Sequence, residues 1–155
     1  MAAVYVFDTC AILETWVRNF PRDVAPGLWE RLEGLIDQGT IVAPDEVFEE
    51  IAKKEDEVHE WAKARRDRLF VPIDDAQAAC VREIVNGYPN ILRSGRNRAD
   101  PFVVALAQVR GLTVVTEEGL DGSDRRPKIP YVCGLRSVAC TNVVGLMREQ
   151  EWELR

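Results

Sequence analysis

The stretch Tyr5-Val6-Phe7-Asp8-Thr9-Cys10-Ala11-Ile12-Leu13 places one acidic residue between two apolar runs. The first run shows no alternation of polar and apolar residues, which is typical of a strand covered on both faces in a parallel sheet. Asp8 then follows the carboxyl end of that strand, and Thr9 begins a turn into a helix. Ligands bind at this edge of open α/β sheets, although an Asp here also suits the N-cap of the following helix. The stretch predicts a buried strand that ends in a capping Asp or a site Asp.

Strand-like and helix-like segments alternate along the rest of the chain. Apolar and β-branched runs predict strands at 41–43, 69–71, 112–116 and 138–141. Helical spacing and end signals predict helices over 10–17, from 26 towards Gly39, from the cap Asp45 towards 65, from the cap Asp75 towards Gly87, from 100 to Gly111, and after the cap Asn142. This alternation predicts an α/β fold, a three-layer α/β/α sandwich with a central parallel sheet and the Asp8 strand near its centre.

Length and composition indicate one domain over residues 1–155, with 46% hydrophobic and 30% charged residues. No apolar run reaches the ~20 residues of a membrane span and no signal peptide is visible, so we expect a cytoplasmic chain. The cysteines Cys10, Cys80, Cys133 and Cys140 show no zinc-ligand or redox spacing, so reduced thiols are expected. A net charge of -6 argues against nucleic-acid binding through an overall basic field.

Asp100 has a position comparable to that of Asp8. It begins a predicted helix with Pro101 after it, which is the usual signature of an N-cap. At ~100° per residue, however, it lies on the same stripe as Val103 and Ala107, which is the side that faces the core. Asp100 is therefore either a helix cap or an acid that points towards the interior.

Two pairs of glutamates complete the acidic pattern. Glu49 and Glu50 lie on the helix after the second strand, where helical spacing does not separate them and an exposed face is an alternative for either. Glu117 and Glu118 follow Thr116 at the end of another predicted strand. Carboxylates ~4 Å apart repel by ~4 kcal/mol per pair at an effective dielectric of 20, so their convergence requires divalent cations. Ligands with oxygen donors alone suit Mg²⁺ or Mn²⁺.

These segments together resemble the four motifs of PIN-domain ribonucleases, the group that includes the VapC toxins of bacterial and archaeal toxin–antitoxin pairs. The matching motifs are Asp8-Thr9, residues 47–51, Ala99-Asp100-Pro101 and Val115-Thr116-Glu117-Glu118. The resemblance spans the chain from Tyr5 to the final helix. It is nearest to an uncharacterised PIN-like subfamily that carries Ile41-Val42-Ala43-Pro44 and Lys128-Ile129-Pro130-Tyr131-Val132-Cys133.

The resemblance implies a catalytic and metal-binding tetrad of Asp8, Glu50, Asp100 and Glu118, with Mg²⁺ or Mn²⁺ as the cofactor. It favours Glu50 over Glu49 because the Glu of the family directly precedes an aliphatic residue. Two positions depart from the family pattern. Glu118 stands where the family usually has Asp, so Asp121 and Asp124 are substitutes for the fourth acid, and Cys10 replaces the usual Asn or Ser.

The same resemblance implies an endoribonuclease, a homodimer, and an antitoxin protein as partner. For RNA we expect contacts from Thr116, Arg96 and Arg98. Basic residues flank the acidic segments at Arg93, Arg96 and Arg98 and again at Arg125, Arg126 and Lys128, with ordinary solvated loops as the alternative. The cluster Lys63, Arg65, Arg66 and Arg68 is interpreted as a favourable helix end. Trp16, Val17, Phe20 and Trp29 are either a partner surface or core.

Two other functions are alternatives to this one. A non-catalytic PIN-like scaffold that binds RNA or a protein partner is compatible with the acidic charge and with Glu at the fourth position. A haloacid-dehalogenase-type phosphatase also begins with a strand and an Asp, but it needs a second Asp two residues later, where this chain has Cys10.

Overall fold

The computed structural model describes residues 2–92 and 98–154, and within them a five-stranded sheet forms the centre of the molecule. Its strand order is β3-β2-β1-β4-β5, and each pair of neighbouring strands is parallel. The strands are β1 (Tyr5–Phe7), β2 (Ile41–Pro44), β3 (Phe70–Val71), β4 (Thr113–Val115) and β5 (Cys140–Thr141). The central place of β1 confirms what its uninterrupted apolar sequence predicts.

The register of the sheet brings the carboxyl ends of β1 and β4 side by side. Tyr5 pairs with Thr113 and Phe7 pairs with Val115. The residues that follow these strands, Asp8 and Thr116, therefore come to the same edge of the sheet.

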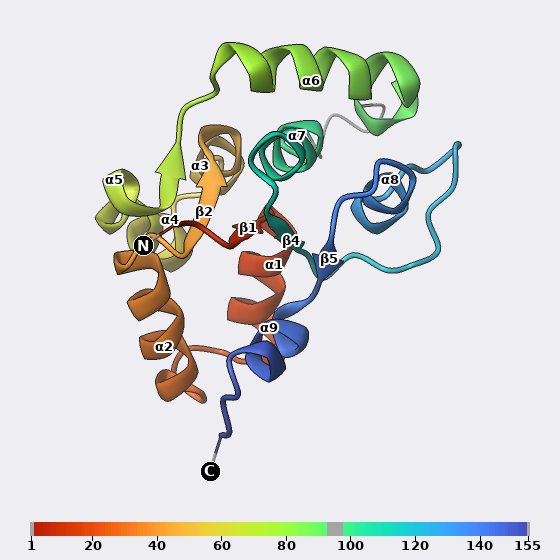
Figure 1. Cartoon of the computed structure of the whole chain (residues 1–155). Coiled ribbons are helices and arrows are strands. Elements are labelled where there is room, and N and C mark those ends of the chain that lie inside the picture. The colour runs from red at the N-terminus through yellow and green to blue at the C-terminus, as the bar shows by residue number, and fades with distance from the viewer. Residues whose placement is uncertain (1, 93–97, 155) are drawn as a thin grey trace.

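Helices cover both faces of this sheet, which confirms the predicted three-layer α/β/α arrangement. The α7 helix lies on one face with α6 outside it, and α1, α2 and α9 lie on the other (Figure 1). The helices are α1 (Thr9–Glu14), α2 (Pro26–Asp37), α3 (Asp45–Ala52), α4 (Glu57–Ala64), α5 (Arg66–Leu69), α6 (Asp75–Gly87), α7 (Asp100–Arg110), α8 (Ile129–Leu135) and α9 (Val143–Glu149), with the π-helix η1 (Thr15–Asn19) and the 3₁₀ helix η2 (Pro89–Leu92). In the described part of the chain, no helix is both long and apolar enough to cross a membrane.

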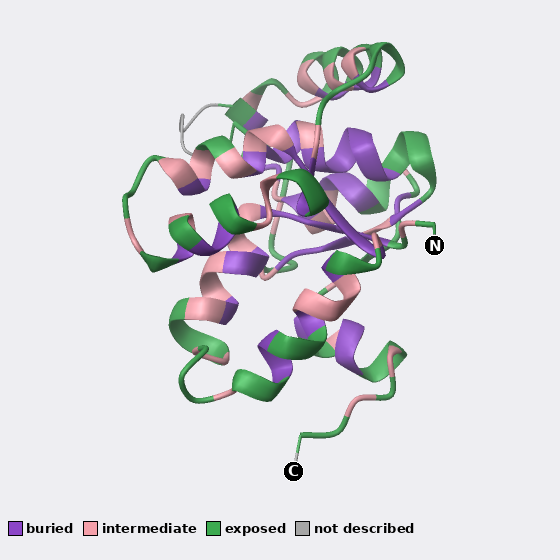
Figure 2. Cartoon of the chain, turned by 90° about the vertical axis from the view of Figure 1, so that its left-hand side faces the viewer, coloured by how far each residue is buried: buried purple, intermediate pink, exposed green. Residues whose placement is uncertain are grey.

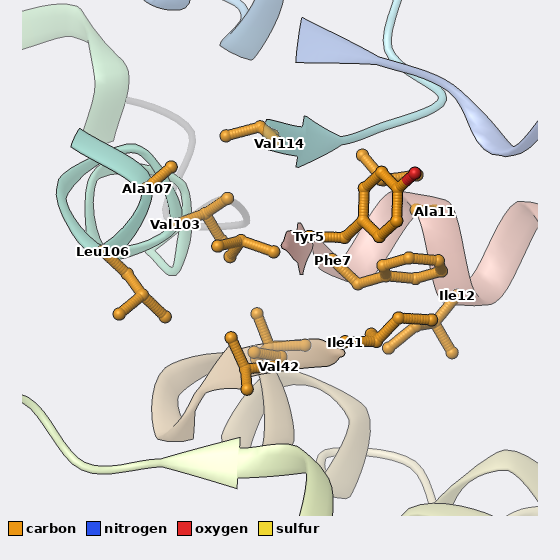
Figure 3. Close-up of a cluster of buried hydrophobic side chains, with 14 of the residues drawn as sticks. Tyr5, Phe7, Ala11, Ile12, Ile41, Val42, Val103, Leu106, Ala107 and Val114 are labelled. Atoms are coloured by element: carbon orange, nitrogen blue, oxygen red, sulfur yellow. The ribbon is translucent and has the colours of Figure 1, made fainter. Parts of the chain in front are cut away.

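One cluster of buried hydrophobic side chains joins the sheet to both helical layers. In the close-up, Val103 and Leu106 extend from α7 on one side of the strands, and Ala11 and Ile12 of α1 lie on the other side (Figure 3). Buried residues follow the strands and the inner faces of the helices, whereas the outer faces are exposed (Figure 2). Burial of this apolar surface is the main term that holds the layers together.

The prediction of one long helix from Asp45 towards Arg65 is wrong, because the segment is divided into α3 and α4, and α5 follows it. The division falls in the charged run 53–57, which offers no apolar residue to the core. Asp56 is the N-cap of α4, since its side chain accepts a hydrogen bond from the backbone N–H of His59 at 3.0 Å. A polar side chain that bonds the backbone in this way competes with continuation of the helix.

Three predicted caps are shifted by one residue. The α6 cap is Asp74, whose carboxylate accepts from the Gln77 N–H at 2.8 Å, and Asp75 is already helical. Pro44 and Ala99 precede α3 and α7, so Asp45 and Asp100 are their first helical residues. The Asn142 cap of α9 is confirmed.

The helix α8 was missed because its sequence, Ile129-Pro130-Tyr131-Val132-Cys133-Gly134-Leu135, contains both Pro and Gly. Pro130 lies in the first turn, where a backbone N–H has no partner inside the helix, so the absence of this N–H in Pro costs no helical hydrogen bond. Glu118, which lies 11 residues earlier in the sequence, caps this helix, since its Oε2 accepts a hydrogen bond from the Ile129 N–H at 2.9 Å. No local pattern in the sequence signals this long-range cap.

Candidate functional site

Asp8 is the most deeply buried acid at the edge where the strands end, with 1% of its surface exposed. Its Oδ1 accepts from the Ala11 N–H at 2.6 Å, which caps α1. Its Oδ2 accepts a hydrogen bond from the Thr116 hydroxyl, which follows the neighbouring strand β4. The capping interpretation is therefore confirmed, and the same carboxylate also faces the strand ends, where its role as a site residue stays a prediction.

Burial raises the pKa of Asp8 to about 8. The hydrogen bonds from Thr116 and Ala11 favour the ionised form and act in the opposite direction, and the charges of Glu118 and Glu117 add to the increase. Desolvation by burial therefore outweighs the two hydrogen bonds that favour the ionised form of Asp8.

Asp100 is the first residue of α7, directly after the N-cap Ala99, and only 6% of its surface is exposed. The capping interpretation is therefore wrong for this residue, and the core-facing one is correct. Burial raises the pKa of Asp100, followed by the charges of Glu118, Asp8 and Glu50 and by a hydrogen bond shared with Glu118. The structure thus brings the four predicted acids near enough for the other three to act on Asp100.

Glu50 approaches this centre from α3. Its Oε1 accepts from the Thr9 hydroxyl at 3.0 Å, and the backbone N–H of Ala99 also bonds its carboxylate. Burial raises the pKa of Glu50, while these two hydrogen bonds lower it. The neighbouring Glu49 is exposed. Contacts from two distant segments therefore separate the two glutamates that helical spacing did not separate.

Glu118 and Glu117 accept hydrogen bonds from the first residues of two different helices, α8 and α9. Glu118 shares a hydrogen bond with Asp100 and holds the first N–H of α8, while its own N–H donates to the Thr116 hydroxyl at 3.1 Å. The Oε1 of Glu117 accepts from the Val143 N–H at the start of α9 at 2.9 Å. The capping role of Glu117 was not foreseen from the sequence.

The two substitutes for the fourth acid take part in other contacts. Asp121 forms an exposed ion pair with Lys128 at 2.7 Å, which lowers its pKa. Asp124 accepts a hydrogen bond from the Tyr131 hydroxyl at 2.6 Å. Of the three candidates, Glu118 is the acid that reaches Asp100.

A family model described as a domain of unknown function, DUF4411, matches residues 5–154. The chain belongs to the DUF4411 family. Comparison with curated proteins gives no match.

The DUF4411 chain is similar in fold to the crystal structure of PAE2754 from Pyrobaculum aerophilum, with a TM-score of 0.50 and 13% identity over 97% of this chain and 98% of that one. The crystal structure of VapBC2 from Rickettsia felis bound to a DNA fragment from their promoter has a TM-score of 0.49 and 17% sequence identity, over 92% of this chain and 98% of that one. The crystal structure of FitAcB from Neisseria gonorrhoeae has a TM-score of 0.49 and 18% sequence identity, over 90% of this chain and 97% of that one. The PIN-like α/β/α fold expected from the sequence is confirmed.

The acidic centre of the DUF4411 chain offers oxygen donors for a cation. Asp8, Glu50, Asp100 and Glu118 supply carboxylates, and burial together with like charge raises the pKa of Asp8, Glu50 and Asp100. This donor chemistry fits Mg²⁺ or Mn²⁺, which prefer oxygen ligands. Among residues 2–92 and 98–154, no three His, Cys, Asp or Glu side chains are arranged to hold an ion as they stand. The tetrad as a metal site stays a prediction.

The basic residues near the centre have different environments. Arg98 is exposed two positions before Asp100, and Arg125 and Arg126 are also exposed. Arg93 and Arg96 lie outside the described residues. The helix-end cluster instead forms ion pairs within the fold: Arg65 with Glu33, Arg66 with Asp45 and Arg68 with Asp37.

The aromatic residues proposed as a partner surface are divided between core and surface. Trp29 is buried, and Trp16 packs edge-on against it with ring centroids 4.9 Å apart. Trp16 and Trp61 line an open cavity of about 1130 Å³, and Val17 is 64% exposed. Trp29 therefore belongs to the core.

Proposed function

We propose that the DUF4411 chain is a metal-dependent endoribonuclease that holds Mg²⁺ or Mn²⁺ at Asp8, Glu50, Asp100 and Glu118. The observation that carries the proposal is the convergence of these acids at the strand ends, where the charges that act most strongly on Asp100 are negative. A divalent cation would offset both their repulsion and their loss of hydration. Without a cation, the repulsion between these acids and their loss of hydration destabilise the folded state.

Asp8 and Asp100 are proposed as direct ligands, and Glu50 and Glu118 as acids that complete the shell or orient a water molecule. When bound, divalent ions neutralise the scissile phosphate and lower the pKa of a bound water. The chain's own side chains hold the acids in place: Thr116 bonds Asp8, and Thr9 bonds Glu50.

RNA is proposed to approach along the exposed side of the centre. Arg98 and the loop residues Arg125 and Arg126 are exposed and can contact phosphates, and Thr116 is proposed to contact substrate near Asp8. Contacts of this kind position a strand without reading its sequence.

We further propose that the chain is the toxin of a toxin–antitoxin pair, with an antitoxin protein as partner and a second copy of the chain as a dimer mate. The support for this proposal is the order of the four motifs, which resembles that of VapC toxins. Co-purification of the chain with the product of the neighbouring gene, and their separation on denaturation, would test it.

The test of the nuclease is cleavage of labelled single-stranded RNA by the purified chain in Mn²⁺ or Mg²⁺ against EDTA. Cleavage should require the metal and should be lost in Asp8→Asn. The pair Glu50→Gln and Glu49→Gln provides a matched control, because only Glu50 contacts Thr9 and Ala99. Glu50→Gln should lose activity and Glu49→Gln should keep it.

Cleavage that persists in Asp8→Asn would mean a contaminant or a site elsewhere. A native chain that cleaves no RNA across several substrates, metals and pH values would favour the non-catalytic scaffold that binds RNA or a protein.

A further inference from the structure

The open cavity of about 1130 Å³ beside Trp16 and Trp61 forms a groove with an apolar floor, named here the tryptophan groove. Its floor comes from Trp16 of η1, Pro26 at the start of α2, and Trp61 of α4. The four acids of the centre are absent from its described lining. Pockets for small ligands enclose roughly 300–1,000 Å³, so an open groove of this size suits a peptide segment better than a small molecule.

One carboxylate, that of Glu33 in α2, holds the walls of the tryptophan groove together. Its Oε1 accepts a hydrogen bond from Arg22 Nη2 at 2.6 Å and lies 3.0 Å from Arg65 Nη2. The guanidinium of Arg22 lies 5.7 Å from the ring centroid of Trp16, and that of Arg65 lies 4.9 Å from the ring centroid of Trp61. These contacts fix the groove before a partner arrives, which lowers the entropy cost of binding.

The basic residues that line the groove are all engaged within the fold. Arg22 and Arg65 pair with Glu33, and Lys63 pairs with Glu60 at 2.7 Å. A partner therefore meets few cations that are free to bind an acidic group.

Three acids of the lining, in contrast, are available to a partner. The side chains of Asp23, Glu55 and Glu57 are exposed and form no hydrogen bond or ion pair with any described residue. When Glu33 is included, six carboxylates and three basic side chains surround the groove. A negative field over an apolar floor favours a segment that carries both cations and apolar side chains.

The same charge disfavours two other occupants. A second copy of the chain carries a net charge of -6, and RNA carries a negative charge on every phosphate. Both would be repelled by the unpaired acids of the groove.

We propose that the tryptophan groove binds a basic, apolar peptide segment of a partner protein. Apolar side chains of the segment pack on Trp16 and Pro26. Its Lys or Arg side chains pair with Asp23, Glu55 and Glu57. This binding uses a surface other than the acidic centre and does not depend on nuclease activity.

The experiment measures, by fluorescence anisotropy, binding of the full chain to a fluorescein-labelled peptide that alternates pairs of Leu and Lys. Two matched peptides, with Glu in place of Lys or with Ser in place of Leu, separate the charged contacts from the apolar ones. The Leu–Lys peptide should bind more weakly as salt rises, and each matched peptide should bind at least about tenfold more weakly than it does. If either matched peptide binds as tightly as the Leu–Lys peptide, the proposal is wrong.

A variant of the chain tests the three unpaired acids. The combined change Asp23→Asn, Glu55→Gln and Glu57→Gln removes their charges and keeps the size of the side chains. Because exposed ion pairs each contribute modestly, the variant should bind the Leu–Lys peptide about tenfold more weakly, with a smaller dependence on salt.

The matched control removes the same amount of charge from exposed positions outside the groove lining, by Glu30→Gln, Asp67→Asn and Glu151→Gln. This control should bind the peptide as the native chain does. Equal affinity in the two variants would mean that the peptide responds only to net charge, and the proposal would be overturned.

NMR of the ¹⁵N-labelled indole groups locates the bound peptide. Trp16 and Trp61 line the groove, whereas Trp152 is not part of its lining and has the guanidinium of Arg31 5.8 Å from its ring centroid. The peptide should shift the signals of Trp16 and Trp61 and leave that of Trp152 in place. Binding that leaves Trp16 and Trp61 unshifted would refute the proposal. Shifts of these two signals with an oligouridylate, or on concentrating the chain alone, would instead assign the groove to RNA or to a second copy.

Discussion

Replacing Asp8 by Asn tests the electrostatics of the centre without any substrate. An unfolded Asp has a pKa of 3.8, and in the fold burial raises the pKa of Asp8 to about 8. Folding at pH 7 without metal therefore requires proton uptake, at about 1.36 kcal/mol per pH unit over roughly three units, or about 4 kcal/mol. Asn needs no proton and keeps a carbonyl oxygen for the Ala11 N–H.

The net gain should be smaller than this figure, because the Thr116 hydroxyl loses its carboxylate acceptor at about 1–2 kcal/mol. We expect Asp8→Asn to raise the free energy of unfolding by about 1–3 kcal/mol in EDTA at pH 7. The matched control is Asp74→Asn, at the exposed cap of α6, which should change stability little because Asn and Asp cap about equally well.

The sign of the pH dependence follows from the raised pKa. Between about pH 4 and pH 8 the folded chain binds more protons at Asp8 than the unfolded chain does, so native stability falls as pH rises through this window. Asp100 has a raised pKa and acts in the same direction. The difference between Asp8→Asn and the native chain should therefore grow from pH 5 to pH 7.

Urea titrations in EDTA at pH 5 and pH 7 measure these quantities, and a repeat with Mn²⁺ should reduce or remove the advantage of the variant. At a metal concentration 100 times the dissociation constant, the native chain should gain about 2.7 kcal/mol and the variant less. If Asp8→Asn is destabilised in EDTA, or if its advantage is the same at both pH values, Asp8 is mainly a helix cap and the electrostatic argument fails.

Three further predictions concern the supports of the centre and one cap. Glu118→Gln should weaken Mn²⁺-dependent stabilisation by about tenfold in apparent affinity, whereas Asp121→Asn, which removes an exposed ion pair, should stay within about twofold in the same thermal titration. Thr116→Val should lower the free energy of unfolding in urea by about 1–3 kcal/mol, since it removes a buried hydroxyl with two hydrogen bonds; no loss would mean that these bonds are dispensable. Asp74→Ala should lower the free energy of unfolding in urea by about 1 kcal/mol, and Asp75→Ala should lower it distinctly less. The reverse order would mean that Asp75 is the cap, as the sequence predicted.

The central sheet could be predicted because its strands are signalled locally. The run Tyr5–Phe7 and the β-branched run Thr113–Val115 are apolar on both faces, as strands between two helical layers must be. The helix boundaries were less predictable where adjacent residues compete. Asp74 and Asp75 both suit a cap, and only backbone geometry decides between them.

The positions of the acids could be predicted, but their partners could not. Asp8 and Asp100 are marked by their places at helix starts, yet the sequence does not say that Thr116 bonds Asp8 or that Ala99, rather than Asp100, is the N-cap of α7. Glu50 is distinguished from Glu49 by contacts with segments far away in the chain. Contacts between distant segments of this kind leave no periodic trace in the sequence.

Glu118 shows how an unusual residue type at the fourth position can still suit the site. Its carboxylate serves two partners in different elements: one contact holds the Ile129 N–H at the start of α8, and another is shared with Asp100 at the start of α7. Its backbone is fixed by Thr116 at the strand end. An acid that must span from the β4 end to two helix starts benefits from the extra methylene of Glu. Glu at this position therefore connects α8 to the acidic centre, because the Glu118 side chain contacts both the start of α8 and Asp100.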